Sequence, residues 1–396
     1  MYVHDKKEDC CGCTACMTVC SVNAITMEND EEGFKYPKIN EKKCIHCNMC
    51  RKVCDFVKQH DWDALPRPVV YAAKQKSDKE RAASQSGGLF AALSDAVLAM
   101  GGVVYGAAYD GEWNVIHKRA ETKEARNEMR GSKYVQSDMQ DTFHRVGEDL
   151  KNGRIVLFSG THCQCAGLKS LLETCRVKTE NLYLVDIVCH GVPSPNVYRA
   201  FQNFMEKKYS GKIENFNFRN KNKFGWHSHV ESTIINGKQY DTKLYVDLFY
   251  GHNTLRPSCY QCPYKHIVHV TDITISDYWG VEKWAPDFDD NRGISLVLLN
   301  TQNGKKLFDL SKAHLDYLKS NTKDCLQPPL QHPFSRPATR DQFWQDFENK
   351  PFEYILTHYT NDYGWKTHVK KTIKKTAKTV LPGSAIVFIK KVLRKS

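Results

Sequence analysis

Two runs of cysteines near the N-terminus have the residue type and the spacing of metal ligands. Each run reads C-x2-C-x2-C-x3-C, the first over residues 10–20 and the second over residues 44–54. Three closely spaced thiolates can hold three corners of one cubane cluster, while the longer step directs the fourth thiolate to a neighbouring cluster. Zinc sites instead use pairs of Cys or His from separated loops. The spacing therefore predicts two 4Fe-4S clusters in a bacterial two-cluster ferredoxin domain.

The pattern also predicts which cysteines share a cluster, because the last cysteine of each run binds the cluster of the other run. Cluster one is expected to be held by Cys10, Cys13, Cys16 and Cys54. Cluster two is expected to be held by Cys44, Cys47, Cys50 and Cys20. This exchange joins both halves into one unit, so a short segment can fold with little core. Cys11 is left as a spare thiol, and Ser21 and Asp55 replace the Pro that usually follows each run.

A second group of cysteines lies far along the chain. The segments 160–164 (GTHCQ) and 189–194 (CHGVPS) each follow an apolar, strand-like run, and 259–262 (CYQC) comes later. Parallel strands present their carboxyl ends at one edge of a sheet, where ligands bind. These segments would therefore bring together Cys163, Cys189, Cys259 and Cys262. Four thiolates suit a third cubane cluster, and a structural zinc ion is the alternative.

Further segments have the residue types of phosphate or substrate sites. Ser86-Gly87-Gly88 precedes an amphipathic helix. The first amides of a helix suit a pyrophosphate, which can approach them closely where glycine has no side chain. An N-cap without a ligand is the alternative. Gly131-Ser132-Lys133-Tyr134 is a second candidate loop. His190 has an ordinary pKa near neutrality, which makes it a candidate proton donor, with a supporting or packing role as the alternative.

The apolar patterning of residues 69–312 positions these motifs in a mixed α/β domain. Strands are expected over residues 69–74, 102–109, 113–119, 154–158, 182–188 and 294–300. Helices are expected over residues 88–100, 166–174, 194–208 and 304–312, with hairpin-like strands within 211–237. Residues 61–69, which include Pro66 and Pro68, are expected to link this domain to the ferredoxin domain.

Charge and hydropathy limit the setting of the protein. Residues 364–396 hold ten Lys or Arg and no acidic residue, which leaves about +2 of the net charge of +12 for the rest of the chain. This basic tail predicts contact with anionic lipid, contact with an acidic redox partner, or a solvated tail. Nucleic acid is not an expected partner, because no recognised reading module is present. No apolar run approaches membrane-spanning length, so we expect a cytoplasmic protein, with the inner membrane face as a further location.

Taken together, the motifs resemble the coenzyme F-420 hydrogenase/dehydrogenase beta-subunit family. The resemblance spans residues 68 to 300 and rests on the segments 86–88, 131–134, 160–164, 189–194, 259–262 and 277–280 in the family's order. It implies a flavoprotein that binds FAD beside an iron-sulfur cluster, which favours the third cluster. The implied cofactor-binding residues are Ser86, Gly87, Gly88, Gly131, Ser132, Lys133, Tyr134, Gly160, Thr161 and Asp277. His162 departs from the family, which usually has Pro at this position.

The predicted fold class is therefore α+β, a small two-cluster ferredoxin domain followed by a mixed α/β flavin-binding domain. The expected boundaries are 1–64 for the ferredoxin domain, 68–335 for the family-like flavin and iron-sulfur domain, and 336–396 for a C-terminal extension with the basic tail. A flavin converts single electrons into hydride transfer. We expect an oxidoreductase that passes electrons between a ferredoxin-like carrier, the clusters, FAD and an organic substrate, in either direction.

Chains of this organisation resemble bacterial versions found alongside surface-polysaccharide enzymes, which would be one setting for such a reaction. The alternative function is a non-catalytic electron-transfer subunit that links a partner redox enzyme to a carrier. Bound FAD with a substrate-dependent absorbance change would favour the enzyme, whereas clusters without flavin would favour the subunit.

Overall fold

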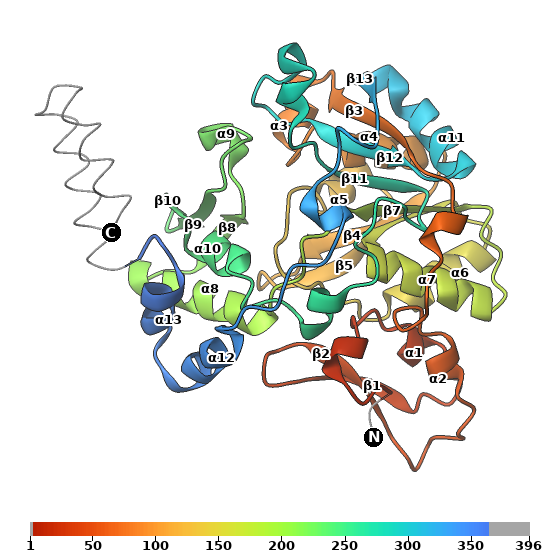
Figure 1. Ribbon diagram of the computed structural model, residues 1–396, viewed down its shortest axis with the longest axis horizontal. Coiled ribbons are helices and arrows are strands. Elements are labelled where there is room, and N and C mark those ends of the chain that lie inside the picture. Colours follow the sequence, from red (N-terminus) through yellow and green to blue (C-terminus); the bar gives the residue numbers. More distant parts are fainter. Residues whose placement is uncertain (1–2, 364–396) are drawn as a thin grey trace, which may run out of the picture.

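The computed structural model describes residues 3–363, in which an N-terminal module, a large mixed sheet and a smaller antiparallel sheet pack together (Figure 1). The basic tail predicted over residues 364–396 lies outside the described residues. Within residues 3–363, no helix combines the length and the apolar character needed to cross a membrane.

The large sheet has eight strands in the order β13-β3-β12-β11-β7-β6-β4-β5. The strands are β3 (Val69–Gln75), β4 (Val103–Tyr109), β5 (Val115–Ala120), β6 (Val156–Thr161), β7 (Leu182–Ile187), β11 (Ile273–Asp277), β12 (Ser295–Leu299) and β13 (Leu315–Ser320). The central strands β4, β6, β7 and β11 run parallel, and the outer pairs are antiparallel. The carboxyl ends of β6, β7 and β11 therefore lie side by side, as the sequence argument for a shared edge requires.

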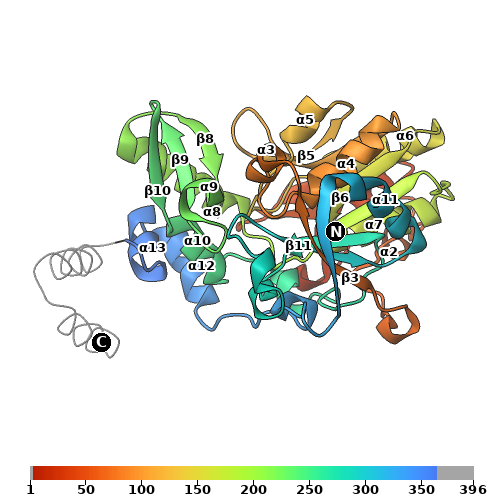
Figure 2. The same cartoon turned by 90° about the horizontal axis from the view of Figure 1, so that it is seen from above.

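Helices cover both faces of this sheet (Figures 1 and 2). One face packs against α4 (Leu89–Ala99) and α11 (Gln302–Ser311), and the other against α6 (Thr142–Lys151) and α7 (His162–Thr174). Adjacent residues of a strand point to opposite faces of the sheet. Val103 accordingly packs into the core on the α6 face, and Val104 packs into the core on the α4 face. The mixed α/β architecture is therefore confirmed. The short helices α3 (Asp78–Ala82) and α5 (Lys123–Asn127) also pack against strands of this sheet.

Helix α7 begins four residues earlier than expected from the sequence. Thr161 and Gln164 form a capping box at the helix start. The Thr161 side chain accepts from the Gln164 amide, and the Gln164 side chain accepts from the Thr161 amide. Cys163 consequently lies in the first helical turn and not in a loop.

The smaller sheet has the order β10-β9-β8 and is antiparallel. Its elements are β8 (Ile213–Asn217), α9 (Lys221–Phe224), β9 (Glu231–Ile235) and β10 (Lys238–Thr242). It shares a core with α8 (Pro195–Tyr209), α10 (Leu244–Tyr250), α12 (Arg340–Asn349) and α13 (Phe352–Tyr359). The described helices beyond residue 336 thus contribute Phe343, Ile355 and Leu356 to the same core as Phe201 and Tyr245.

The N-terminal module consists of α1 (Ala15–Thr18), the hairpin β1 (Ile25–Asn29) and β2 (Lys35–Ile39), and α2 (Met49–Lys52). Cys16, Ile25 and Val53 pack into the same core as Phe143 and Leu168, which come from α6 and α7. The module therefore rests directly on the large sheet's helical layer.

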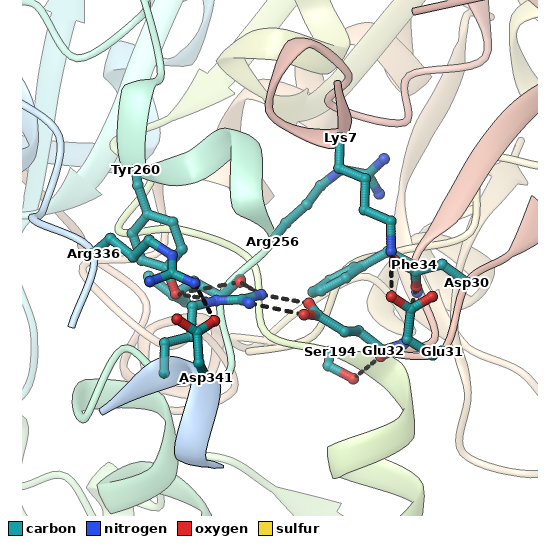
Figure 3. Close-up of polar contacts among 12 residues, drawn as sticks. Lys7, Asp30, Glu31, Glu32, Phe34, Ser194, Arg256, Tyr260, Arg336 and Asp341 are labelled. Atoms are coloured by element: carbon teal, nitrogen blue, oxygen red, sulfur yellow. Dashed lines mark hydrogen bonds and ion pairs between the residues drawn. The ribbon is translucent and has the colours of Figure 1, made fainter. Parts of the chain in front are cut away.

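The tip of the β1–β2 hairpin also reaches the smaller sheet region (Figure 3). The buried Glu32 carboxylate pairs with both terminal nitrogens of Arg340 on α12, and Ser194 Oγ donates to Glu32 O. These contacts join the N-terminal module to the C-terminal helices of the described chain.

Short 3-10 turns fill the connections. They are η1 (Lys7–Asp9), η2 (Trp62–Ala64), η3 (Pro257–Gln261), η4 (Val281–Lys283), η5 (Pro286–Phe288), η6 (Lys312–His314) and η7 (Pro328–Leu330).

Candidate metal centres and the adjoining cavity

The cysteines expected to hold cluster one surround a single small cavity. Its wall includes Cys10, Cys13, Cys16 and Cys54. All sixteen cysteines are free thiols, so none of these sulfurs is used in a disulfide. Burial raises the pKa of Cys54 to about 12 and that of Cys16 well above its usual range. Metal ions bind thiolates, so loading this site would displace those protons.

The loop that carries the first three of these ligands has an unusual backbone, and the second run repeats it. Gly12 and Thr14 have positive φ angles of 74° and 72°. The residues at the matching places of the second run, His46 and Asn48, have φ angles of 55° and 57°. Non-glycine residues seldom adopt this conformation. Both loops therefore wrap around their sites in the same way, which fits two clusters of one kind.

The second site lies at the outside of the module. Cys47 is exposed, and Cys20, Cys44 and Cys50 are half-buried. The Ala24 amide donates to Cys20 Sγ at 3.2 Å, a contact that stabilises sulfur carrying negative charge. Burial raises the pKa of Cys50, and the neighbouring Cys44 and Cys47 sulfurs raise it further.

The third group of cysteines lines one enclosed cavity. The ligand candidates are Cys163, Cys189, Cys259 and Cys262. They come from the first turn of α7, the end of β7, η3 and the residue that follows η3. Burial raises the pKa of Cys259 to about 12 and also raises that of Cys189. Four thiols around one cavity fit a tetrathiolate metal group, which the sequence predicted.

Cys11, a spare thiol in the sequence, lies between two of these sites. It lines both the cluster-one cavity and the third cavity. Sequence reasoning missed this position because, apart from Phe56, the other residues that line the third cavity lie more than 140 positions away. The two sites therefore adjoin each other across the interface between the N-terminal module and α7.

A much larger cavity of about 1050 Å³ opens at the carboxyl edge of the parallel strands. Its size is at the upper end for small-molecule sites and suits a dinucleotide. Of the residues that the resemblance implied, its lining includes Ser86, Gly88, Gly131, Ser132, Lys133, Tyr134, Gly160, Thr161 and Asp277, and His190 also lines it. Gly87 is not in the lining, since a Cβ there would lie 2.3 Å from Ala73 O. Its role is close packing of the helix start on β3.

Two features of this cavity suit an anionic group. Helix α4 begins at Gly88, whose φ is 88°, and no side chain caps its first amides. Lys133 is held by a 2.8 Å hydrogen bond from Nζ to Arg130 O, and burial lowers its pKa to about 7. Helix N-termini and cations both bind phosphate.

The large cavity and the third cysteine cavity share a wall. Both are lined by Thr161, Ile187, Val188, Cys189, Gly191, Val192 and Pro329. Thr161 Oγ1 also lies 3.1 Å from Cys163 Sγ. A metal group at the third site would therefore lie next to any molecule bound in the large cavity.

Two of the predicted residues have partners that narrow their roles. The Asp277 carboxylate accepts from Trp226 Nε1 at 2.6 Å and pairs with Arg219, so it ties the end of β11 to the smaller sheet. His190 Nε2 lies 2.7 Å from His252 Nε2. Burial lowers the pKa of His190 to about 3, which favours the neutral ring, and its role as a proton donor stays a prediction.

The departure from the family at His162 is accommodated by a buried polar group. Asp186 Oδ2 lies 2.6 Å from His269 Nδ1 and 3.5 Å from His162 Nδ1. The two imidazole rings stack with centroids 4.0 Å apart, so their in-plane lone pairs do not converge on one point. We therefore interpret this group as a support for the start of α7, in which His162 Nε2 accepts from the Val270 amide at 3.3 Å while its buried Nδ1 has no hydrogen-bond partner among the described residues. The residue types of the group alone suit a metal ion.

Comparisons with known proteins agree with this organisation. Residues 9–56 match the family model of the 4Fe-4S dicluster domain, so the N-terminal module is such a domain and the protein is an iron-sulfur protein of the oxidoreductase type. Residues 153–322 match the family model for the C terminus of the coenzyme F420 hydrogenase/dehydrogenase beta subunit. The resemblance seen in the sequence is thereby confirmed, and this chain is related to that family through the part that carries all four cysteines of the third site.

A solved structure and a search of curated proteins complete the comparisons. The F420-reducing [NiFe] hydrogenase complex from Methanosarcina barkeri contains a chain with 16% identity and a TM-score of 0.47. The match covers 81% of this chain and 96% of that chain. No curated protein matches.

Proposed function

We propose that this protein is a flavin-dependent iron-sulfur oxidoreductase that exchanges electrons between a ferredoxin-like carrier and an organic substrate. The observation that carries the proposal is the continuous series of adjoining sites. The cluster-one cavity meets the third cysteine cavity at Cys11, and the third cavity shares a wall with the large cavity at Thr161 and Cys189. Adjoining sites of this kind suit electron transfer between metal groups and an organic cofactor.

FAD is the cofactor that we assign to the large cavity. The start of α4 at Gly88, which has no side-chain cap, and the Lys133 ammonium would hold the pyrophosphate of FAD. The open space at Gly131 would let the cofactor approach the protein backbone there. A bound flavin would supply the exchange between single electrons and a hydride. His190, which lines this cavity, would contact the organic substrate, and His252, whose Nε2 lies 2.7 Å from His190 Nε2, would hold the His190 ring in place. The surface-polysaccharide setting stays a prediction about that substrate.

The test is anaerobic purification of the full chain followed by iron, sulfide and flavin determination on one sample. About twelve iron atoms per chain and one FAD would support three cubanes and the flavin site. The variant Cys259→Ser is expected to lose about four of these iron atoms, while Cys175→Ser, at an exposed cysteine outside all three sites, keeps them.

Two results would contradict the proposal in different ways. About eight iron atoms with FAD would leave the third site to zinc or to free thiols. Eight iron atoms without flavin, even after FAD is supplied, would leave the non-catalytic electron-transfer subunit as the function.

A further inference from the structure

Arg256, the residue before η3, is a fully buried cation. Its guanidinium donates from Nε to Cys10 O at 2.7 Å, from Nη1 to Gln136 Oε1 at 2.9 Å and from Nη2 to Lys35 O at 3.0 Å. These acceptors are all neutral. Within residues 3–363, no carboxylate lies within ion-pair distance of it. Other buried arginines of the chain, such as Arg219 and Arg340, do have carboxylate partners.

The groups around Arg256 that can carry negative charge are sulfurs from two metal sites. Its Nη2 lies 3.7 Å from Cys10 Sγ, a candidate ligand of cluster one. Arg256 also lines the third cavity together with Cys259 and Cys163. The guanidinium therefore touches both sites from one fixed position.

Several contacts hold the guanidinium rigidly in this position. It lies over the Tyr36 ring with 4.2 Å to the ring centroid. It also lies over the Phe34 ring at 5.4 Å, and Figure 3 labels both Arg256 and Phe34. A Cβ on Gly12 would lie 2.9 Å from Nη1, so the cluster-one loop approaches Arg256 as closely as its backbone permits. The side chain is thus fixed by the hairpin on one side and by the ligand loop on the other.

A buried cation without a counter-charge is strongly unfavourable. A cubane held by four thiolates carries net negative charge, and one at each site would supply the missing counter-charge. We propose that Arg256 is the shared counter-charge of cluster one and of a cluster at the third site, and that it raises the reduction potentials of both. The part concerning the third site rests on the proposed function, whereas the part concerning cluster one rests on the dicluster domain alone.

The expected direction follows from the charge change on reduction. Each cluster accepts one electron from the carrier, no bond forms or breaks, and the cluster becomes more negative by one charge. A fixed neighbouring cation stabilises the reduced form more than the oxidised form. Removal of the cation therefore makes reduction harder, and the midpoint potential becomes more negative.

Lys265 provides a matched control within the same region. It is buried, its Nζ donates to Cys189 O, and it lines the third cavity but not the cluster-one cavity. Loss of the Lys265 charge should consequently change only the third site, whereas loss of the Arg256 charge should change two sites.

The experiment is a redox titration of the anaerobic full chain, followed by electron paramagnetic resonance, with signals assigned through Cys54→Ser and Cys259→Ser. We expect Arg256→Gln to lower the reduction equilibrium constant of cluster one and of the third cluster at least tenfold, which corresponds to about 59 mV for one electron. We expect Lys265→Gln to shift only the third cluster, and Arg256→Lys, which keeps the charge, to shift both by less than Arg256→Gln. Cluster two should not change in any of these variants.

Unchanged midpoint potentials in Arg256→Gln with both clusters intact would overturn the proposal. Equal shifts of the potentials in Arg256→Gln and Arg256→Lys would also overturn it, because they would assign the effect to hydrogen bonds and not to charge. If Arg256→Gln does not retain iron at cluster one, Arg256→Lys becomes the test. A fall of tenfold or more in the reduction equilibrium constant of cluster one in Arg256→Lys would then overturn the proposal. A third site without iron would contradict the proposed function, while the cluster-one shift would still decide the role of Arg256.

Discussion

The two cysteine sites of the dicluster domain have the same ligand spacing and the same loop backbone, yet they lie in different surroundings. Cluster two is bounded by exposed residues, among them Cys47 and Ile45, whose side chain is 60% exposed. Cluster one is enclosed by α7 and by Arg256. The ligand motif thus specifies the kind of cluster, and the packing of the domain decides which site faces solvent and which faces the rest of the protein.

The largest expected effect is the loss of a single cluster when a fourth ligand is removed. The spacing predicts that the runs exchange their last cysteines, so Cys54→Ser should remove cluster one and keep cluster two, and Cys20→Ser should do the reverse. Iron analysis should show a loss of about four atoms in each variant, with the resonance signal of the other cluster retained. If Cys54→Ser instead removes cluster two, each run holds its own cluster and the crossed assignment is wrong.

The order in which the clusters decompose tests the difference in exposure. Under ferricyanide or a chelator, cluster two should be lost first, since Cys47 is exposed while Cys10 and Cys16 are buried. Resonance spectra recorded during the reaction would measure this order. Equal rates for both clusters would show that the α/β domain does not protect cluster one.

The contact that joins the tip of the β1–β2 hairpin to α12 has a large expected energy. Removing one partner of the buried Glu32–Arg340 pair, as in Arg340→Met, should lower the free energy of unfolding by about 3–5 kcal/mol, because the other charge stays buried without a partner. Denaturant unfolding measures this change. Lys151→Met, which removes a pair with the exposed Glu148, is the control and should cost below about 1 kcal/mol. Similar losses in both variants would contradict a special role of the buried pair.

A smaller effect is expected at the point where α7 approaches the cluster-one loop. A Cβ on Gly167 would lie 2.7 Å from Cys13 Sγ, so Gly167→Ala should destabilise the chain by about 1–3 kcal/mol and disturb the cluster-one signal. Gly147→Ala in α6 is the matched control, since its added Cβ would have open space. That variant should be stabilised by about 0.5–1 kcal/mol, as for Ala over Gly in a helix. A normal cluster-one signal in Gly167→Ala would show that α7 can move away from the loop.

Sequence patterning predicted the strands β3, β4, β5, β6, β7 and β12 and the helices α4, α7, α8 and α11. It missed β13, whose residues Leu315–Ser320 are mostly exposed at the sheet edge, and β11, which carries Thr274 and Ser276. Burial between neighbouring strands makes β11 a central strand despite those hydroxyl groups. Such pairing is not visible in the local pattern.

The dicluster domain was predictable from the sequence alone, because two cubanes demand a fixed number of thiolates at short spacing and that demand is local to the chain. The positions of Cys11, Gly167 and Arg256 were decided only by the tertiary structure. Each acts through a neighbour more than 100 residues away, and nothing in the local sequence specifies which charge or surface that neighbour brings. Long-range packing of the dicluster domain on α7 therefore determines how two equal ligand motifs become one outer and one inner site.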